Sequence, residues 1–129
     1  MKDIEKREDI ELLVDTFYQK VIKDPVIGYL FNEVVPLNWE LHIPKMYDFW
    51  ESVLLDSQNY RGNPMKAHLD LHVKEALKKE HFDQWLVLFD QTLKELFSGP
   101  KADLALVRAQ SIATVIQAKI YQFEKGMVG

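Results

Sequence analysis

Apolar residues in this chain recur every three or four positions, and this spacing is the strongest constraint on its fold. One face of a helix has this period, whereas a half-buried strand alternates at every second position. Four such stripes stand at Ile10, Leu13, Phe17 and Val21; at Trp39, Ile43, Met46, Phe49, Trp50, Val53 and Leu54; at Phe82, Trp85, Leu86, Phe89, Leu93, Leu96 and Phe97; and at Leu104, Val107, Ile112, Val115, Ile116, Ile120 and Phe123. The pattern predicts an all-α protein.

Prolines and glycines divide these stripes into segments. The breaks fall at Asp24-Pro25, Pro36-Leu37-Asn38, Gly62-Asn63-Pro64 and Ser98-Gly99-Pro100. Asn63 before Pro64 is typical of an N-cap followed by proline at the first helical position, which predicts a short helix to about residue 72. Together the segments predict five or six helices, over 10–22, 39–55, 63–72, 82–97 and 101–124 among them, in one domain spanning 1–129.

Composition excludes several classes of protein. The chain has no cysteine, which excludes a disulfide framework, thiolate-bound zinc and a cysteine nucleophile. Its net charge of -4, with scattered basic residues, argues against nucleic-acid binding. The longest apolar run, Trp85 to Phe89, is too short to span a membrane, and the charged N-terminus does not resemble a secretory signal. We therefore expect a cytoplasmic protein.

The aromatic residues allow two interpretations. Three Trp, five Tyr and seven Phe are a generous supply for a helical chain of 129 residues. Most should fill the core, and Phe97, Tyr121 and Phe123 have no other evident role. Alternatively, several rings line a flat, apolar cofactor slot. The pattern alone leaves both interpretations open.

Four histidines are the candidate metal ligands. His68 and His72 are four apart and would share a helix face, as in helical zinc pairs, but the glutamate of an HExxH motif is missing. His81 should be solvated or should cap a helix. His42 lies on the stripe of Met46 and Phe49 and is expected to point inward, where a hydrogen-bonded core role and a ligand role both remain open.

The order of several short motifs across five segments is more specific than any motif alone. Between about residues 8 and 124 the chain resembles the group III truncated haemoglobins. The resemblance is carried by Phe17-Tyr18, residues 24–31 (DPVIGYLF), Trp39 with His42, Phe49-Trp50, residues 60–64 (YRGNP) with 66–69 (KAHL), and residues 81–86 (HFDQWL). The paired glycines of other truncated-globin branches are absent, which agrees with group III.

The resemblance implies a two-over-two helical sandwich that encloses one haem b. It places His68 as the proximal iron ligand and Phe31, Lys45 and Phe49 beside the haem, with Lys45 toward a propionate. It also implies a distal ligand pocket, formed by Tyr18, His42, Met46 and Trp85. Met46 stands where isoleucine is expected, which affects how tightly the pocket closes.

The implied function is binding of dioxygen and other diatomic ligands, nitric oxide and carbon monoxide among them. An O–H and an indole N–H aimed at bound dioxygen should slow its release, which favours redox chemistry over transport. An NO dioxygenase or peroxidase activity at the same haem is the enzymatic alternative, and it needs an external reductase because the sequence contains no flavin motif. A haem-free helical interaction module is a third possibility. The sequence leaves the oligomeric state open.

Overall fold

The computed structural model describes residues 1–31, 39–56 and 77–125, which form helices α1 (Arg7–Lys23), α2 (Trp39–Leu55), α4 (Lys79–Leu96) and α5 (Pro100–Lys125). Within these ranges no residue is in a strand, so the all-α prediction is confirmed. Each helix lies within a few residues of its predicted bounds. The predicted helix at 63–72, the motifs at 60–69 and the histidines His68 and His72 lie outside the described residues.

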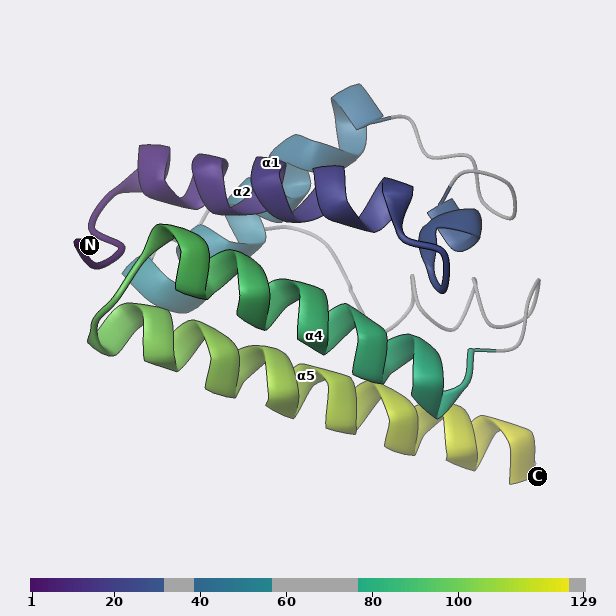
Figure 1. The fold of residues 1–129 in the computed structure, drawn as a ribbon. Helices are drawn as coiled ribbons and strands as arrows, with labels where there is room; N and C mark the ends of the chain where they lie inside the picture. The colour runs from purple at the N-terminus through teal and green to yellow at the C-terminus, as the bar shows by residue number, and fades with distance from the viewer. Residues whose placement is uncertain (32–38, 57–76, 126–129) are drawn as a thin grey trace.

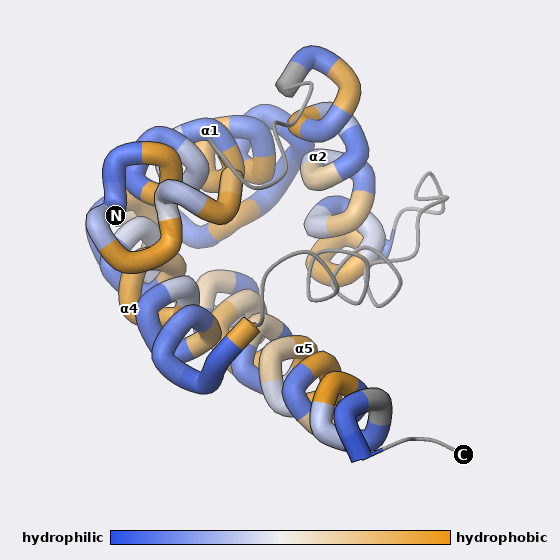
Figure 2. Tube along the Cα trace, turned by 90° about the vertical axis from the view of Figure 1, so that its right-hand side faces the viewer, coloured by the Kyte–Doolittle hydropathy of each residue, from blue (hydrophilic) through white to orange (hydrophobic). Residues whose placement is uncertain are grey.

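The helices form two layers. Viewed from the end, α1 and α2 make the upper layer and α4 and α5 the lower one (Figure 2). Helix α1 packs on both α2 and α4, and α5 packs on both α4 and α2, so every helix contacts both layers (Figure 1). This is the two-over-two arrangement that the sequence predicts.

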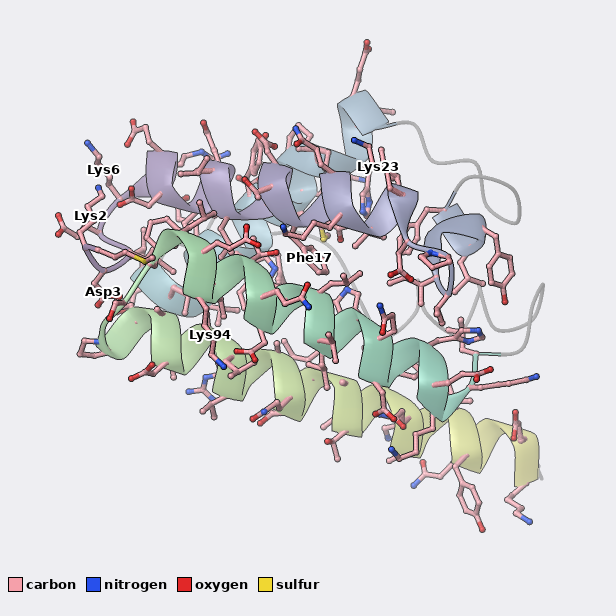
Figure 3. The ribbon with its side chains drawn as sticks, viewed as in Figure 1. Lys2, Asp3, Lys6, Phe17, Lys23 and Lys94 are labelled. Carbon is pink, nitrogen blue, oxygen red and sulfur yellow. The ribbon has the colours of Figure 1, made fainter. Side chains whose placement is uncertain are left out.

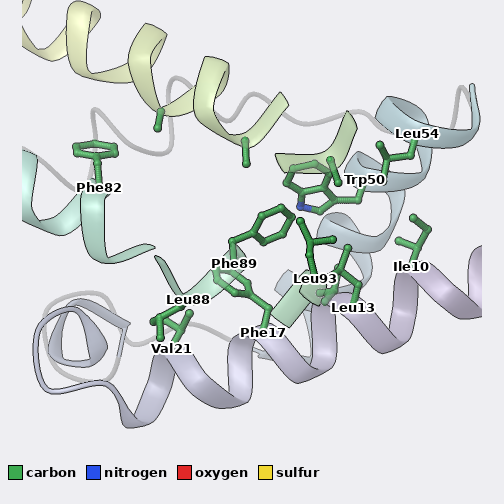
Figure 4. Close-up of a cluster of buried hydrophobic side chains, with 14 of the residues drawn as sticks. Ile10, Leu13, Phe17, Val21, Trp50, Leu54, Phe82, Leu88, Phe89 and Leu93 are labelled. Atoms are coloured by element: carbon green, nitrogen blue, oxygen red, sulfur yellow. The ribbon is translucent and has the colours of Figure 1, made fainter. Parts of the chain in front are cut away.

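Phe17 lies at the centre of the contact between the layers. Its ring is 2% exposed and meets the edge of Phe89 at a centroid distance of 5.2 Å. The other residues of its stripe, Ile10, Leu13 and Val21, are also buried, as predicted (Figure 4). Burying one such apolar side chain contributes about 1.5–3 kcal/mol, so the α1 stripe is a major source of stability.

Helix α5 buries four alanines that the predicted stripe does not include. They are Ala102, Ala105, Ala109 and Ala113, and the buried face continues with Ile116 and Ile120 of the predicted stripe. Alanines allow two helices to approach closely, because interaxial distance depends on side-chain size at the contact. The predicted stripe is correspondingly wrong at Val107 and Val115, which are 53% and 50% exposed, and Tyr121 is 61% exposed rather than part of the core. Phe97 is buried as predicted.

The first residues of the chain fix the start of α5. The Asp3 carboxylate accepts hydrogen bonds from the backbone N–H groups of Lys101 at 3.0 Å and Ala102 at 2.9 Å. The Ser98 N–H donates to the Lys2 carbonyl at 3.0 Å. Figure 3 shows Lys2 and Asp3 at the end of the molecule where α5 begins. Gly99 has φ +147°, and a Cβ there would lie 2.6 Å from Asp3, so only glycine fits between the two segments.

A second aspartate supports the N-terminal segment from within α1. Asp9 is 5% exposed and accepts hydrogen bonds from the N–H groups of Glu5 and Lys6 and from Lys2 Nζ. Burial opposes ionisation of Asp3 and Asp9, but the donors outweigh it and hold the pKa of each below its ordinary value. Both carboxylates therefore stabilise the fold in their charged form.

We expect these aspartates to make the protein acid-sensitive. A depressed folded-state pKa adds stability that is present above the unfolded-state pKa, near 3.9, and disappears as the pH falls through the folded-state value. Asp3→Ala should lower the free energy of unfolding by about 0.5–2 kcal/mol at pH 7, since it removes a helix cap. Asp3→Ala should also reduce the decline of the free energy of unfolding below pH 4, measured by urea unfolding at each pH. Asp83→Ala, which removes an exposed ion pair with Lys79, should cost at most about 0.5 kcal/mol. Equal losses from the two variants would contradict this account.

The turn after α1 is held against α4. Asp24 Oδ2 accepts hydrogen bonds from the N–H groups of Val26 at 2.8 Å and Ile27 at 3.0 Å, as the carboxylate of an aspartate commonly does in a turn. Its other oxygen accepts from Gln84 Nε2 at 2.7 Å. These bonds position residues 24–31, the segment that carries Phe31.

Candidate functional site

Tyr18 joins two helices and the segment after α1. Its ring lies 5.1 Å from Phe17, 6.2 Å from Phe31 and 5.6 Å from His42, each an edge-on contact between centroids. Tyr18 is partly buried, and burial raises the pKa of its phenol. The hydroxyl therefore keeps its proton at physiological pH and is available as a hydrogen-bond donor.

Helix α2 contributes one face to the same region. His42, Met46 and Phe49 follow one another at intervals of four and three, which places them on one side of a helix. All three are partly buried, and Met46 and Phe49 pack against the core. The contact between the rings of Tyr18 and His42 places this face of α2 against α1. Lys45 is exposed.

Trp85 reaches the region from α4. Its indole meets the edge of Phe17 at 5.5 Å with an interplanar angle of 90°, and it stacks on Phe89 at 5.5 Å and 1°. Phe17 therefore contacts both Tyr18 and Trp85, so the two polar aromatic side chains lie near one another across a single buried ring. The sequence analysis did not identify Phe17 as the link, although its position beside Tyr18 could have suggested one.

Six of the predicted site residues thus belong to one neighbourhood. Phe31, Met46, Phe49 and Trp85 offer partly buried apolar surface, and Tyr18, His42 and Trp85 add polar groups. A flat apolar cofactor with a reactive centre needs this combination of apolar walls and a few polar groups. The donor set therefore fits the distal side of a haem. The predicted axial ligand, His68, lies outside the described residues.

His81 has a structural role at the start of α4. Its Nδ1 accepts the backbone N–H of Lys78 at 3.0 Å, and its Nε2 lies 3.3 Å from the hydroxyl of Tyr29. The capping role expected for His81 is confirmed, but the side chain is 8% exposed and is not solvated. Together with the Asp24 and Gln84 bond, this contact fixes residues 24–31 on α4.

Residues 1–31, 39–56 and 77–125 contain no group of three His, Asp or Glu side chains that could hold a metal ion without a cofactor. Over the same part of the chain, no helix has both the length and the apolar character needed to cross a membrane.

Comparison with protein families identifies the class. Residues 2–118 match the family model described as bacterial-like globin. The chain therefore belongs to the bacterial-like globins, a family whose membership supports haem-based binding of gases in general.

Individual relatives narrow this assignment. The group 3 truncated hemoglobin ctb of Campylobacter jejuni subsp. jejuni is 35% identical over 120 residues, which cover 91% of this chain and 92% of that protein. The group 1 truncated hemoglobin LI410 of Chlamydomonas moewusii is 30% identical over 115 residues, 85% of this chain and 63% of the relative.

A solved structure agrees with the sequence relatives. The crystal structure of group III truncated hemoglobin from Campylobacter jejuni superposes with a TM-score of 0.81 at 34% identity, covering 95% of this chain and 98% of that one. The chain is accordingly a truncated haemoglobin of group III, as the ordered motifs predicted.

Proposed function

We propose that this protein binds dioxygen and other diatomic ligands at the iron of a haem b, and that it serves ligand or redox chemistry rather than transport. The observation that supports this best comes from the ring contacts in a chain of the globin family: Tyr18 and Trp85 both contact Phe17, and His42 contacts Tyr18. We place this function in a single domain, residues 1–129, working in the cytoplasm.

The residues proposed to hold the haem are Phe31, Lys45, Phe49 and His68. When bound, the haem would supply binding of gas molecules and one-electron chemistry, and His68 would hold its iron through an imidazole nitrogen. Because the chain contains no cysteine, a thiolate cannot replace His68 as the axial ligand. Phe31 and Phe49 supply apolar walls, and exposed Lys45 is free to reach a propionate at the edge of the site.

The distal side is proposed to consist of Tyr18, His42, Met46 and Trp85. Bound dioxygen carries partial negative charge, so a donor aimed at it favours the bound state. Trp85 has only an N–H to offer, and the raised pKa of Tyr18 keeps its O–H intact. Each hydrogen bond contributes about 1–3 kcal/mol in a water-poor pocket, and about 1.4 kcal/mol corresponds to tenfold in affinity. Dioxygen is therefore released slowly, which suits chemical reaction of the bound ligand better than its transport.

Titration of the purified protein with hemin tests the proposal. We expect a sharp Soret band that saturates at one haem per chain, and a shift of that band when the ferrous protein meets carbon monoxide. A linear titration without a saturation point, with unchanged thermal stability, would contradict the proposal and favour the haem-free interaction module instead.

An NO dioxygenase or peroxidase activity is the second candidate, favoured by the polar aromatic groups Tyr18 and Trp85. The NO dioxygenase activity requires electrons from a separate reductase, whereas a peroxidase takes its electrons from the substrate that it oxidises. Reaction of the ferrous dioxygen complex with nitric oxide decides the first case: a rate no greater than that of free dioxygen would exclude it.

A further inference from the structure

A stack of aromatic rings leads from the candidate site into the core. Trp85 lies parallel to Phe89 at 5.5 Å and 1°, and Phe89 stacks on Trp50 at 4.9 Å and 23°. Trp50 is 5% exposed, so the second indole is enclosed by protein (Figure 4). Electron transfer weakens steeply with distance, and indoles are among the side chains that lose an electron most readily. The stack therefore connects two oxidisable groups through one ring.

Tyr47 extends the stack of Trp85, Phe89 and Trp50 toward the surface. It stands three positions before Trp50 on α2, a spacing that makes two side chains neighbours on a helix. Tyr47 is partly buried, and its hydroxyl donates a hydrogen bond to Asp15 of α1. Burial and this bond raise the pKa of Tyr47, so the phenol is protonated at neutral pH. A tyrosine that loses an electron must also release its proton, and Asp15 is placed to accept it.

The charges around Tyr47 favour the loss of an electron from its ring. Arg7 lies 5.8 Å from the ring centroid, but its guanidinium is shared among carboxylates of both helices. These partners are Glu11 at 3.3 Å, Asp48 at 2.9 Å and Glu51 at 3.0 Å. Asp15 adds a fourth carboxylate, which accepts the hydrogen bond of the Tyr47 hydroxyl. The surplus of negative charge stabilises loss of an electron from Tyr47.

We propose that Tyr47 is a surface oxidation site for small neutral phenols, connected to the haem pocket by Trp50, Phe89 and Trp85. The inference rests on the proposed haem function, with hydrogen peroxide as the oxidant. One peroxide takes up two electrons and two protons and becomes two water molecules. In each of two rounds Tyr47 gives up one electron along the stack and its proton to Asp15. Asp15 is exposed and releases this proton to solvent before the next round, and the two protons that the peroxide takes up come from solvent. A phenol then returns one electron and one proton to Tyr47 and leaves as a phenoxyl radical.

Peroxide treatment of the ferric holoprotein in the presence of a nitroso spin trap, followed by peptide mass spectrometry, tests the path without relying on turnover. We expect the trap on Tyr47 in the parent protein. Trp50→Phe keeps an aromatic ring of similar shape but removes the readily oxidised indole, and should abolish the Tyr47 adduct. Asp15→Asn keeps an acceptor oxygen but takes up no proton, and should reduce the adduct strongly.

Two controls test whether charge or exposure alone, and not the aromatic stack, determines which tyrosine the trap labels. Asp48→Asn removes one negative charge beside Arg7 without touching the Tyr47 hydroxyl, and should keep most of the adduct. Tyr121, exposed on α5 with Lys125 Nζ 5.3 Å from its ring, should stay unlabelled. Melting curves of each holoprotein show whether a variant has lost its fold.

Each outcome is decisive. Labelling of Tyr121 in place of Tyr47, or a Tyr47 adduct that survives Trp50→Phe in a folded holoprotein, would overturn the inference while the Soret band shows that haem binding stands. A protein without a Soret band would overturn the proposed function and the inference together. Equal losses from Asp15→Asn and Asp48→Asn would show that charge alone, and not proton transfer to Asp15, governs Tyr47.

Discussion

Replacing His68 by alanine should deprive the protein of stable haem. An imidazole is the only strong axial donor that the resemblance assigns to the proximal side, and the chain has no cysteine to take its place. We expect hemin affinity to fall by more than about 100-fold, or about 2.7 kcal/mol. The measurement is a hemin titration followed at the Soret band, beside the parent protein.

His72→Ala is the matched control, because it removes the same type of side chain four positions further along. It should leave the titration unchanged. Free imidazole should restore the spectrum of the His68→Ala protein by binding in the vacated position. Loss of haem from His72→Ala with retention in His68→Ala would show that the axial ligand has been assigned to the wrong residue.

Phenylalanine at position 18 or 85 should speed the release of dioxygen. Tyr18→Phe removes one hydroxyl, and Trp85→Phe removes the indole N–H while keeping a ring against Phe17. Each lost hydrogen bond of about 1–3 kcal/mol corresponds to a rate increase of about 5- to 150-fold. Stopped-flow displacement of dioxygen by carbon monoxide measures the rate, and the double variant shows whether the two donors act independently.

Trp50→Phe provides the comparison for this series. It changes an indole two rings further along the same stack, away from Tyr18, and should leave dioxygen release unaltered. If Trp85→Phe also leaves the rate unaltered, the indole does not face the ligand, and its role is confined to packing.

The sequence predicted the large apolar faces well. The α1 stripe is buried because Ile10, Leu13 and Phe17 are bulky and regularly spaced. The α5 face was misjudged because Ala102, Ala105 and their successors contribute little to a hydrophobic pattern. Valines at 107 and 115 carry more apolar surface, but they point away from the layers. A search for runs of small residues at helical spacing would have found the correct face.

The residues of the site could be predicted from the sequence, but their arrangement in space could not. Resemblance alone assigned Tyr18 and Trp85 to a pocket, and periodicity placed His42 inward without deciding its role. How Tyr18 and Trp85 both contact Phe17, and how His42 contacts Tyr18, depends on the packing of α1, α2 and α4. Local signals performed better: the cap at Asp24 could be predicted from its own dipeptide with Pro25. His81 was recognised as a cap, but its burial depends on Tyr29, 52 positions away in sequence.

The contact of Asp3 with α5 also affects the order in which the chain folds. The Asp3 carboxylate and the Lys101 N–H are 98 positions apart, so on a ribosome this contact must wait until residue 101 has emerged. Pairings between distant positions close large loops and tend to form late in folding. The start of α5 thus depends on a residue made 98 positions earlier. A change that removes or displaces Asp3 would therefore weaken a helix that lies far from it in the sequence.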